Sequence, residues 1–185
     1  MDHTRTRRRQ VPRLQEQLRT WCDALALRLA GAPSTPGIDI HAVSYGESAP
    51  RIRRTDLEGN VVDLVLFQDE PILLLFWSPG CGYCQALLSH MLAFERSPNR
   101  ARMVVLSGGT ISVNRELGFV SPVVLDDDRA IAQAFGVTGT PAAVLIGAQG
   151  IVAAEVARGA TAVRAYVYRC VAGGTLPARD QTDFS

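Results

Sequence analysis

The sequence predicts an α/β domain in which helices cover a central β-sheet. Short apolar runs, which are typical of buried strands, alternate with longer helix-like segments along most of the chain. With 185 residues, 47% of them hydrophobic, the chain can bury a sizeable core without a disulfide framework. Its formal net charge of +1 indicates no strongly charged partner and gives no reason to expect nucleic-acid binding.

The first 43 residues are predicted to precede the main domain. They combine a basic tail, an amphipathic helix from Pro12 to about Ala30, and a Pro- and Gly-containing linker at residues 31–37. The helix is indicated by apolar residues at spacings of three and four, namely Leu14, Leu18, Trp21, Leu25 and Leu29. We interpret the tail as a solvated segment, because no aromatic residues are interleaved with its arginines. Contact with nucleic acid or anionic lipid is the alternative.

The main domain is expected to span residues 44–174, with a C-terminal tail at 175–185. An N-terminal β-hairpin is indicated at residues 51–65, where Glu58-Gly59-Asn60 supplies the turn. Strands are then predicted at residues 71–77, 103–106, 122–125, 142–147 and 151–157, and helices at residues 82–96, 129–135 and 161–172. The run Asp126-Asp127-Asp128 is predicted to cap the second of these helices.

Residues 71–94 carry no charged side chain, which raises the question of a membrane span. Pro79-Gly80 divides this window into a buried strand and a helix, and neither part is long enough to cross a bilayer. No transmembrane segment is therefore evident in this chain. The segment after Arg7-Arg8-Arg9 is too polar to be the apolar core of an export signal.

A pair of cysteines two residues apart, Cys81-Gly82-Tyr83-Cys84, carries the strongest functional signal. The pair follows an apolar strand and a turn, and it precedes a helix-like stretch. A dithiol at the start of a helix is exposed to free backbone N–H groups and to the helix dipole, which both favour thiolate over thiol. Because thiolates attack disulfides, the pattern predicts thiol–disulfide exchange. Cys81, nearer the helix start, is the expected nucleophile, and Cys84 is the expected resolving thiol.

A structural zinc site is the rival interpretation of such a pair, because two closely spaced cysteines can form half of one. Zinc needs four ligands, usually from a second pair of Cys or His residues. The remaining cysteines, Cys22 and Cys170, and the three histidines are isolated in the sequence. We therefore expect no metal and no cofactor. Cys22 and Cys170 are interpreted as core thiols, although a disulfide between them is also conceivable.

A second motif supports the first. The apolar run at residues 142–146 is preceded by Gly139-Thr140-Pro141. Proline is restricted to the edges and starts of strands, and an X-Pro bond can also adopt the cis form. With the dithiol present, we expect the Thr140–Pro141 bond to be cis; an ordinary trans proline at a strand start is the alternative.

These motifs together resemble the thioredoxin superfamily, and more closely its TlpA-like branch, which includes the MauD-like proteins. The matching stretches are Gly46–Pro50, Asp56–Leu64, Phe76–Cys84 and Phe135–Pro141. The resemblance implies a thioredoxin-like central mixed β-sheet flanked by helices, preceded here by the hairpin and the extra amphipathic helix. It also implies that a cis-proline loop faces the two cysteines and docks an extended substrate. The substrate-binding residues implied are Trp77, Gly82, Tyr83, Thr140 and Pro141.

The sequence departs from the family at the positions where an acid would help the second cysteine. Thioredoxins carry a buried Asp six residues before the first Cys, and this position is Leu75 here. Some TlpA-like proteins carry a Glu three residues after the second Cys, and this position is Leu87. The sequence therefore assigns no general base.

Two classes of function follow from these observations. The first is a thiol-disulfide oxidoreductase that acts on protein disulfides together with a redox partner that the sequence does not identify. The second is a non-catalytic thioredoxin-like module that holds a partner in the groove between the cysteines and Thr140-Pro141. A cytoplasmic location is favoured because no signal or anchor is visible, and the family resemblance implies an extracytoplasmic or membrane-associated alternative.

Overall fold

The computed structural model describes residues 42–67, 70–98 and 100–172. The amphipathic helix expected at residues 12–30, the basic tail and Cys22 lie outside the described residues. The limits predicted for the domain, 44–174, stay a prediction. No helix among the described residues is both long enough and apolar enough to span a membrane.

Within the described residues, five strands form a mixed sheet in the order β5-β4-β3-β6-β7. The strands are β3 (Ile72–Trp77), β4 (Arg102–Ser107), β5 (Val123–Leu125), β6 (Ala142–Ile146) and β7 (Ala157–Arg158). β3, β4 and β5 are parallel to one another, whereas β6 is antiparallel to both of its neighbours. In this register Phe76 lies opposite Leu106 on one side and Ala142 on the other. The C-terminal end of β3 and the N-terminal end of β6 therefore lie next to each other, at the same end of the sheet.

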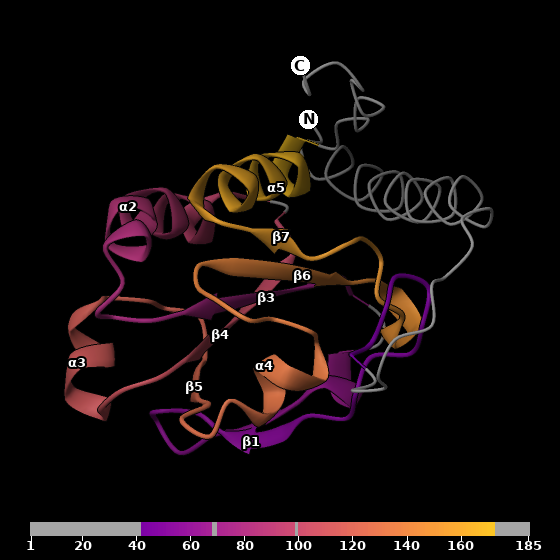
Figure 1. Ribbon diagram of the computed structural model, residues 1–185, viewed down its shortest axis with the longest axis horizontal. Helices are drawn as coiled ribbons and strands as arrows, with labels where there is room; N and C mark the ends of the chain where they lie inside the picture. The colour runs from indigo at the N-terminus through magenta and orange to yellow at the C-terminus, as the bar shows by residue number, and fades with distance from the viewer. Residues whose placement is uncertain (1–41, 68–69, 99, 173–185) are drawn as a thin grey trace, which may run out of the picture.

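Helices cover both faces of the sheet, as Figure 1 shows. Helices α2 (Gly82–Arg96) and α5 (Ala160–Ala172) pack over one face, and α4 (Ala130–Ala134) covers the other. Successive side chains of a strand point to opposite faces. Leu73 and Leu75 accordingly join the core beneath α2 and α5, while Leu74 and Phe76 join the core beneath α4. All six residues of β3 are buried, which explains its unbroken apolar sequence.

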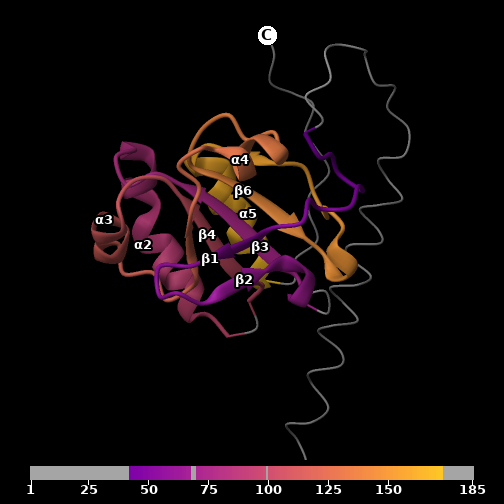
Figure 2. The same ribbon diagram turned by 90° about the horizontal axis from the view of Figure 1, so that it is seen from below.

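The predicted hairpin is confirmed and lies on the α4 side of the sheet, seen from below in Figure 2. It pairs β1 (Arg53–Thr55) with β2 (Val61–Asp63) and is followed by the short 3-10 helix η2 (Leu64–Phe67). The carboxylate of Asp56 accepts the backbone N–H groups of Glu58 and Asn60 across the turn. Gly59 has φ +86°, a conformation that favours glycine. The turn therefore forms at the residues that the sequence predicts for it.

The strand predicted at residues 151–157 is wrong in its extent, because regular strand pairing is limited to β7 (Ala157–Arg158). The turn before it forms the 3-10 helix η3 (Ala148–Gly150), and Ile151 and Val152 make only isolated bridges. Val152 lies opposite Ile146 but Ala157 lies opposite Ala143, so five steps along this segment match three steps along β6. Two extra residues therefore bulge out of the ladder, and regular pairing resumes only in β7.

Candidate active site

The dithiol lies where the chain passes from β3 to α2. After Trp77 the chain turns through Ser78–Gly80, and the Cys81 N–H donates to the Ser78 carbonyl at 3.1 Å. Cys81 occupies the N-cap position of α2 with extended backbone (φ −88°, ψ 118°). Its sulfur thus lies beside the backbone N–H groups of the first helical turn, which is the arrangement that stabilises a thiolate.

The loop before β6 lies against Cys81 from the other side. The Thr140–Pro141 bond is cis, which confirms the expectation from the sequence. The Cys81 thiol donates to the Thr140 carbonyl oxygen at an Sγ–O distance of 3.3 Å. Cys81 and Thr140 are 59 residues apart in the chain, and they meet because β6 begins beside the end of β3.

The pKa of Cys81 is lowered from its ordinary value. Partial burial alone would raise this pKa, but hydrogen bonds to the sulfur outweigh it. The donors are the backbone N–H and the thiol of Cys84, the side chain of Thr140, and the backbone N–H of Tyr83. Hydrogen bonds to a charged group favour that charged form. Cys81 is therefore the more readily ionised of the two thiols.

The environment of Cys84 has the opposite effect. Its side chain is 0% exposed, and burial raises the pKa of its thiol to about 12. Leu75 and Leu87, the positions at which related proteins carry an acid, are both buried in the same core cluster as Cys84. Neither supplies a carboxylate, so Cys84 remains a protonated thiol at neutral pH.

The other predicted site residues divide into exposed and buried groups. Gly82 is exposed and the Tyr83 side chain is 73% exposed, so both are open to a substrate beside Cys81. Trp77 is 2% exposed and packs edge to face against Phe119, with ring centroids 5.5 Å apart. It lies in the core cluster that contains Cys84 and against which Cys81 packs. Cys170 is buried in α5.

One hydrogen bond at the dithiol end of the sheet could not be predicted from the sequence. Asp127 accepts the backbone N–H of Gly109 at 2.9 Å, although the sequence predicts it only as part of a helix cap. This hydrogen bond joins the loops after β4 and β5. Pro79, in the loop after β3, lies nearby, since a Cβ added to Gly109 would stand 3.9 Å from the proline ring. The acidic run was the only signal in the sequence, and it does not show which loop Asp127 contacts.

The difference between the two thiols can be tested by alkylation. At pH 7 iodoacetamide should modify Cys81 first, because its lowered pKa gives more thiolate while Cys84 remains a buried thiol. The rate should fall as the pH falls through the pKa of Cys81, since protonation removes the nucleophile. Peptide mass spectrometry of a Cys22→Ser/Cys170→Ser background would locate the label. First modification of Cys84 would contradict the assignment.

Comparison with known proteins identifies relatives of this chain. The family model of the thioredoxin-like domain matches residues 62–166. The thiol-disulfide oxidoreductase ResA of Bacillus thuringiensis subsp. konkukian is 25% identical over 121 residues, 62% of this chain and 70% of that protein. ResA of Bacillus subtilis is 27% identical over 116 residues, 59% of this chain and 65% of that protein. The chain thus spans about two thirds of the length of these relatives.

Solved structures share the fold. A putative thiol:disulfide interchange protein DsbE from Chlorobium tepidum superposes with a TM-score of 0.58 at 21% identity, covering 70% of this chain and 96% of that one. A thiol:disulfide interchange protein from Bacteroides sp. superposes with a TM-score of 0.57 at 24% identity, covering 70% and 91%. These findings confirm the thioredoxin-like fold and the TlpA-like resemblance. Because the family model matches more than half of the chain, including both cysteines and the cis proline, this protein belongs to the thioredoxin-like family.

Proposed function

We propose that this protein is a thiol-disulfide oxidoreductase that exchanges disulfides with protein substrates through Cys81 and Cys84. The observation that carries the proposal is the contrast between the two thiols. Cys81 is partly exposed with a lowered pKa, whereas Cys84 is buried with a raised one. The ResA relatives, named as thiol-disulfide oxidoreductases, support the same reaction class.

In the proposed reaction the Cys81 thiolate attacks one sulfur of a substrate disulfide. The substrate S–S bond breaks, a mixed disulfide forms on Cys81, and the released sulfur takes up a proton. Cys84 then loses its proton and attacks the Cys81 sulfur. This second step releases the other substrate sulfur as a thiol and leaves a Cys81–Cys84 disulfide. Two electrons pass from the protein to the substrate, and the reverse sequence oxidises a dithiol substrate.

The substrate is proposed to bind as an extended strand along the loop before β6. The backbone of Thr140 lies beside Cys81, and the following Pro141 carries no N–H. An extended chain can pair with the backbone of this loop, as in strand addition. Gly82 and the exposed Tyr83 would flank it on the helix side, while the buried Trp77 lies in the core cluster against which Cys81 packs.

The alternative function is a binding module that uses the same groove without exchange. An insulin-reduction assay and a measured reduction potential separate the two. We expect insulin turnover that requires a thiol reductant, and a potential between about −270 and −120 mV, the range of known family members. A potential near −270 mV would indicate a reductant and one near −120 mV an oxidant. A wild-type protein that reduces no disulfide would leave only the binding function.

The compartment in which this reaction takes place stays a prediction. A cytoplasmic location is favoured by the sequence, and the family resemblance implies an extracytoplasmic or membrane-associated alternative. The measured potential bears on this choice, because structural disulfides persist in oxidising compartments and are rare in reducing ones.

A further inference from the structure

A cavity lined by both polar and apolar residues lies next to the proposed exchange site. It has a volume of about 310 Å³ and sits where β3, β4 and β5 end. Its lining includes Ser78 and Thr140 from the dithiol region, Gly108 and Gly109 after β4, and Asp127 and Arg129 after β5. In open α/β sheets, ligands bind outside the carboxyl ends of the parallel strands. This volume is at the lower end of the range for small-ligand pockets, about 300–1,000 Å³, so it suits a small molecule better than a folded protein.

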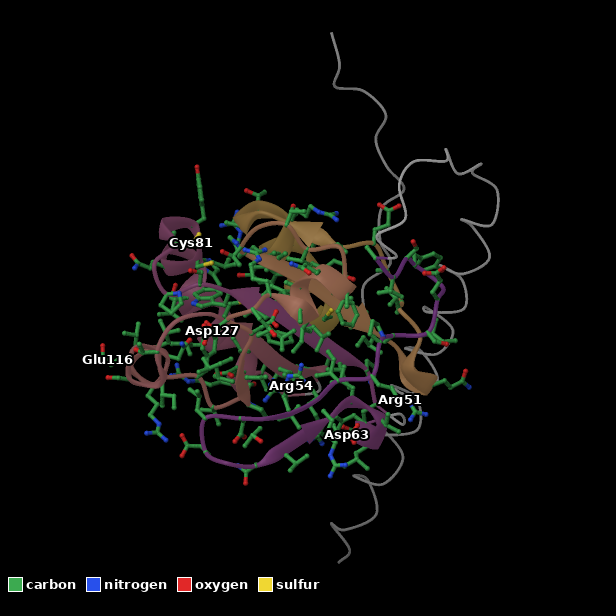
Figure 3. All side chains as sticks on the ribbon, turned by 60° about the horizontal axis from the view of Figure 1, so that its bottom comes forward. Arg51, Arg54, Asp63, Cys81, Glu116 and Asp127 are labelled. Carbon is green, nitrogen blue, oxygen red and sulfur yellow. The ribbon has the colours of Figure 1, made fainter. Side chains whose placement is uncertain are left out.

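One contact connects this cavity to the reactive thiol, because Thr140 lines the cavity and also accepts the hydrogen bond of the Cys81 thiol at 3.3 Å. On the other wall, Gly109 donates its N–H to Asp127. A Cβ added to Gly109 would stand 3.9 Å from the ring of Pro79, two residues before Cys81. Figure 3 shows Cys81 and Asp127 toward the same end of the sheet. A molecule whose sulfur reaches Cys81 can therefore extend its other groups into the cavity.

Asp126, Asp127 and Arg129 line the cavity, and of these the Asp127 carboxylate and the Arg129 guanidinium are not paired with each other. In the part of the chain that the structure describes, no ion pair joins Asp127 to Arg129. Within the described residues, Asp127 accepts a hydrogen bond from Gly109 through one oxygen, and Arg129 donates one N–H to the Val137 carbonyl at 3.2 Å. The guanidinium has four further N–H donors. Asp126 differs, because both of its oxygens accept backbone N–H groups of α4.

We propose that this cavity binds the amino and carboxylate groups of a small amino-acid disulfide, such as cystine, and positions its sulfur for exchange with Cys81. The Asp127 carboxylate accepts hydrogen bonds from the ammonium group, and the Arg129 guanidinium donates hydrogen bonds to the carboxylate. Both interactions are charge-assisted, which makes them stronger than hydrogen bonds between neutral groups. The assignment rests on the proposed exchange function and adds a small-molecule redox partner to it. Cys81 attacks one sulfur, the first amino-acid thiol leaves with a proton, and Cys84 displaces the second. The protein becomes the Cys81–Cys84 disulfide, and the disulfide partner becomes two thiols.

Four disulfides that differ only in their charged groups test this proposal. L-Cystine carries both groups, cystamine only the amine, 3,3′-dithiodipropionate only the carboxylate, and 2-hydroxyethyl disulfide neither. Each would oxidise the full-length reduced protein, and the rate constant would be measured by alkylating the remaining thiols at timed intervals. Comparison of each variant with wild type, disulfide by disulfide, cancels the intrinsic reactivity of each compound.

Asp127→Asn should slow cystine and cystamine by about tenfold or more, since a hydrogen bond to a charged group is lost, and leave the other two unchanged. Arg129→Asn should slow cystine and dithiodipropionate by a similar factor; Asn tolerates the positive φ of 57° at this position. Asp128→Asn is the matched control, because it removes the same charge from an exposed neighbour that does not line the cavity.

The outcomes separate this proposal from the exchange function itself. If wild-type protein reacts with hydroxyethyl disulfide but the variants affect all four compounds alike, or none of them, the cavity assignment is wrong and the exchange function stands. An equal loss in insulin reduction would also overturn it, because the cavity would then serve the protein substrate. If wild-type protein reacts with none of the four compounds, the proposed exchange function is wrong, and the cavity assignment that rests on it is wrong with it.

Discussion

Cys84→Ser protein should accumulate a stable mixed disulfide with its substrate, whereas Cys81→Ser protein should accumulate none. Cys81 has the lowered pKa and partial exposure that attack requires, and Cys84 is the buried thiol that would resolve the adduct. Both variants should lose insulin turnover by about three orders of magnitude or more, because the two thiols act as a unit. Non-reducing electrophoresis after an acid quench would reveal the adduct.

The adduct must be assigned to one sulfur for this result to count. A Cys22→Ser/Cys170→Ser background removes the two other cysteines of the chain, so that any adduct lies on the dithiol. Adding dithiothreitol should release the substrate and restore the free variant. Equal adduct yields from both single variants would show that the asymmetry between Cys81 and Cys84 does not control attack.

The second large effect concerns the start of α4. Asp126 is 8% exposed and accepts the N–H groups of Ile131 and Ala132 at 3.0 and 2.9 Å. Asp126→Ala leaves both buried donors without an acceptor. Such donors cost about 1–3 kcal/mol each, so the variant should lose roughly 2–6 kcal/mol of unfolding free energy. Urea denaturation should show a lower midpoint with an unchanged slope.

Two control variants show whether burial causes this loss. Asp128→Ala removes an acceptor from the same helix start, where the N–H of Ala130 is its partner, but the site is exposed and water replaces the carboxylate. Its midpoint should stay near that of the wild type. Asp126→Asn keeps one acceptor oxygen and should fall between Asp126→Ala and the wild type. Equal shifts for the two alanine variants would exclude the buried hydrogen bonds as the cause.

The dithiol and the elements on either side of it could be predicted because their signals are local. Six consecutive apolar residues indicate a strand buried on both faces, and α2 begins and ends where the helix pattern does, at residues 82–96. The cis proline was expected only in combination with the cysteines. Thr140 and Cys81 are 59 residues apart, and their contact depends on the antiparallel pairing of β6 with β3.

Features that depend on tertiary contacts could not be predicted. Nothing in the sequence of residues 151–157 shows that two residues bulge out of the ladder, because the whole segment is rich in small apolar residues. Helix α3 (Ile111–Glu116) is short and was not predicted, although Thr110 caps it with its hydroxyl. The buried carboxylate of Glu95 accepts N–H groups of Val120 and Ser121, 25 and 26 residues further along the chain.

The antiparallel direction of β6 also determines where the domain can be attached to a surface without blocking the dithiol. β6 starts beside the dithiol and ends at the opposite end of the sheet. There η3 reverses the chain direction, and Gln149 is exposed. Exposed turns of this kind are the sites at which proteins best tolerate insertions. A reporter or surface tether attached at residues 148–150 would therefore point away from the reactive sulfur. On an electrode or a bead, the domain would present its exchange site outward, toward diffusing partners.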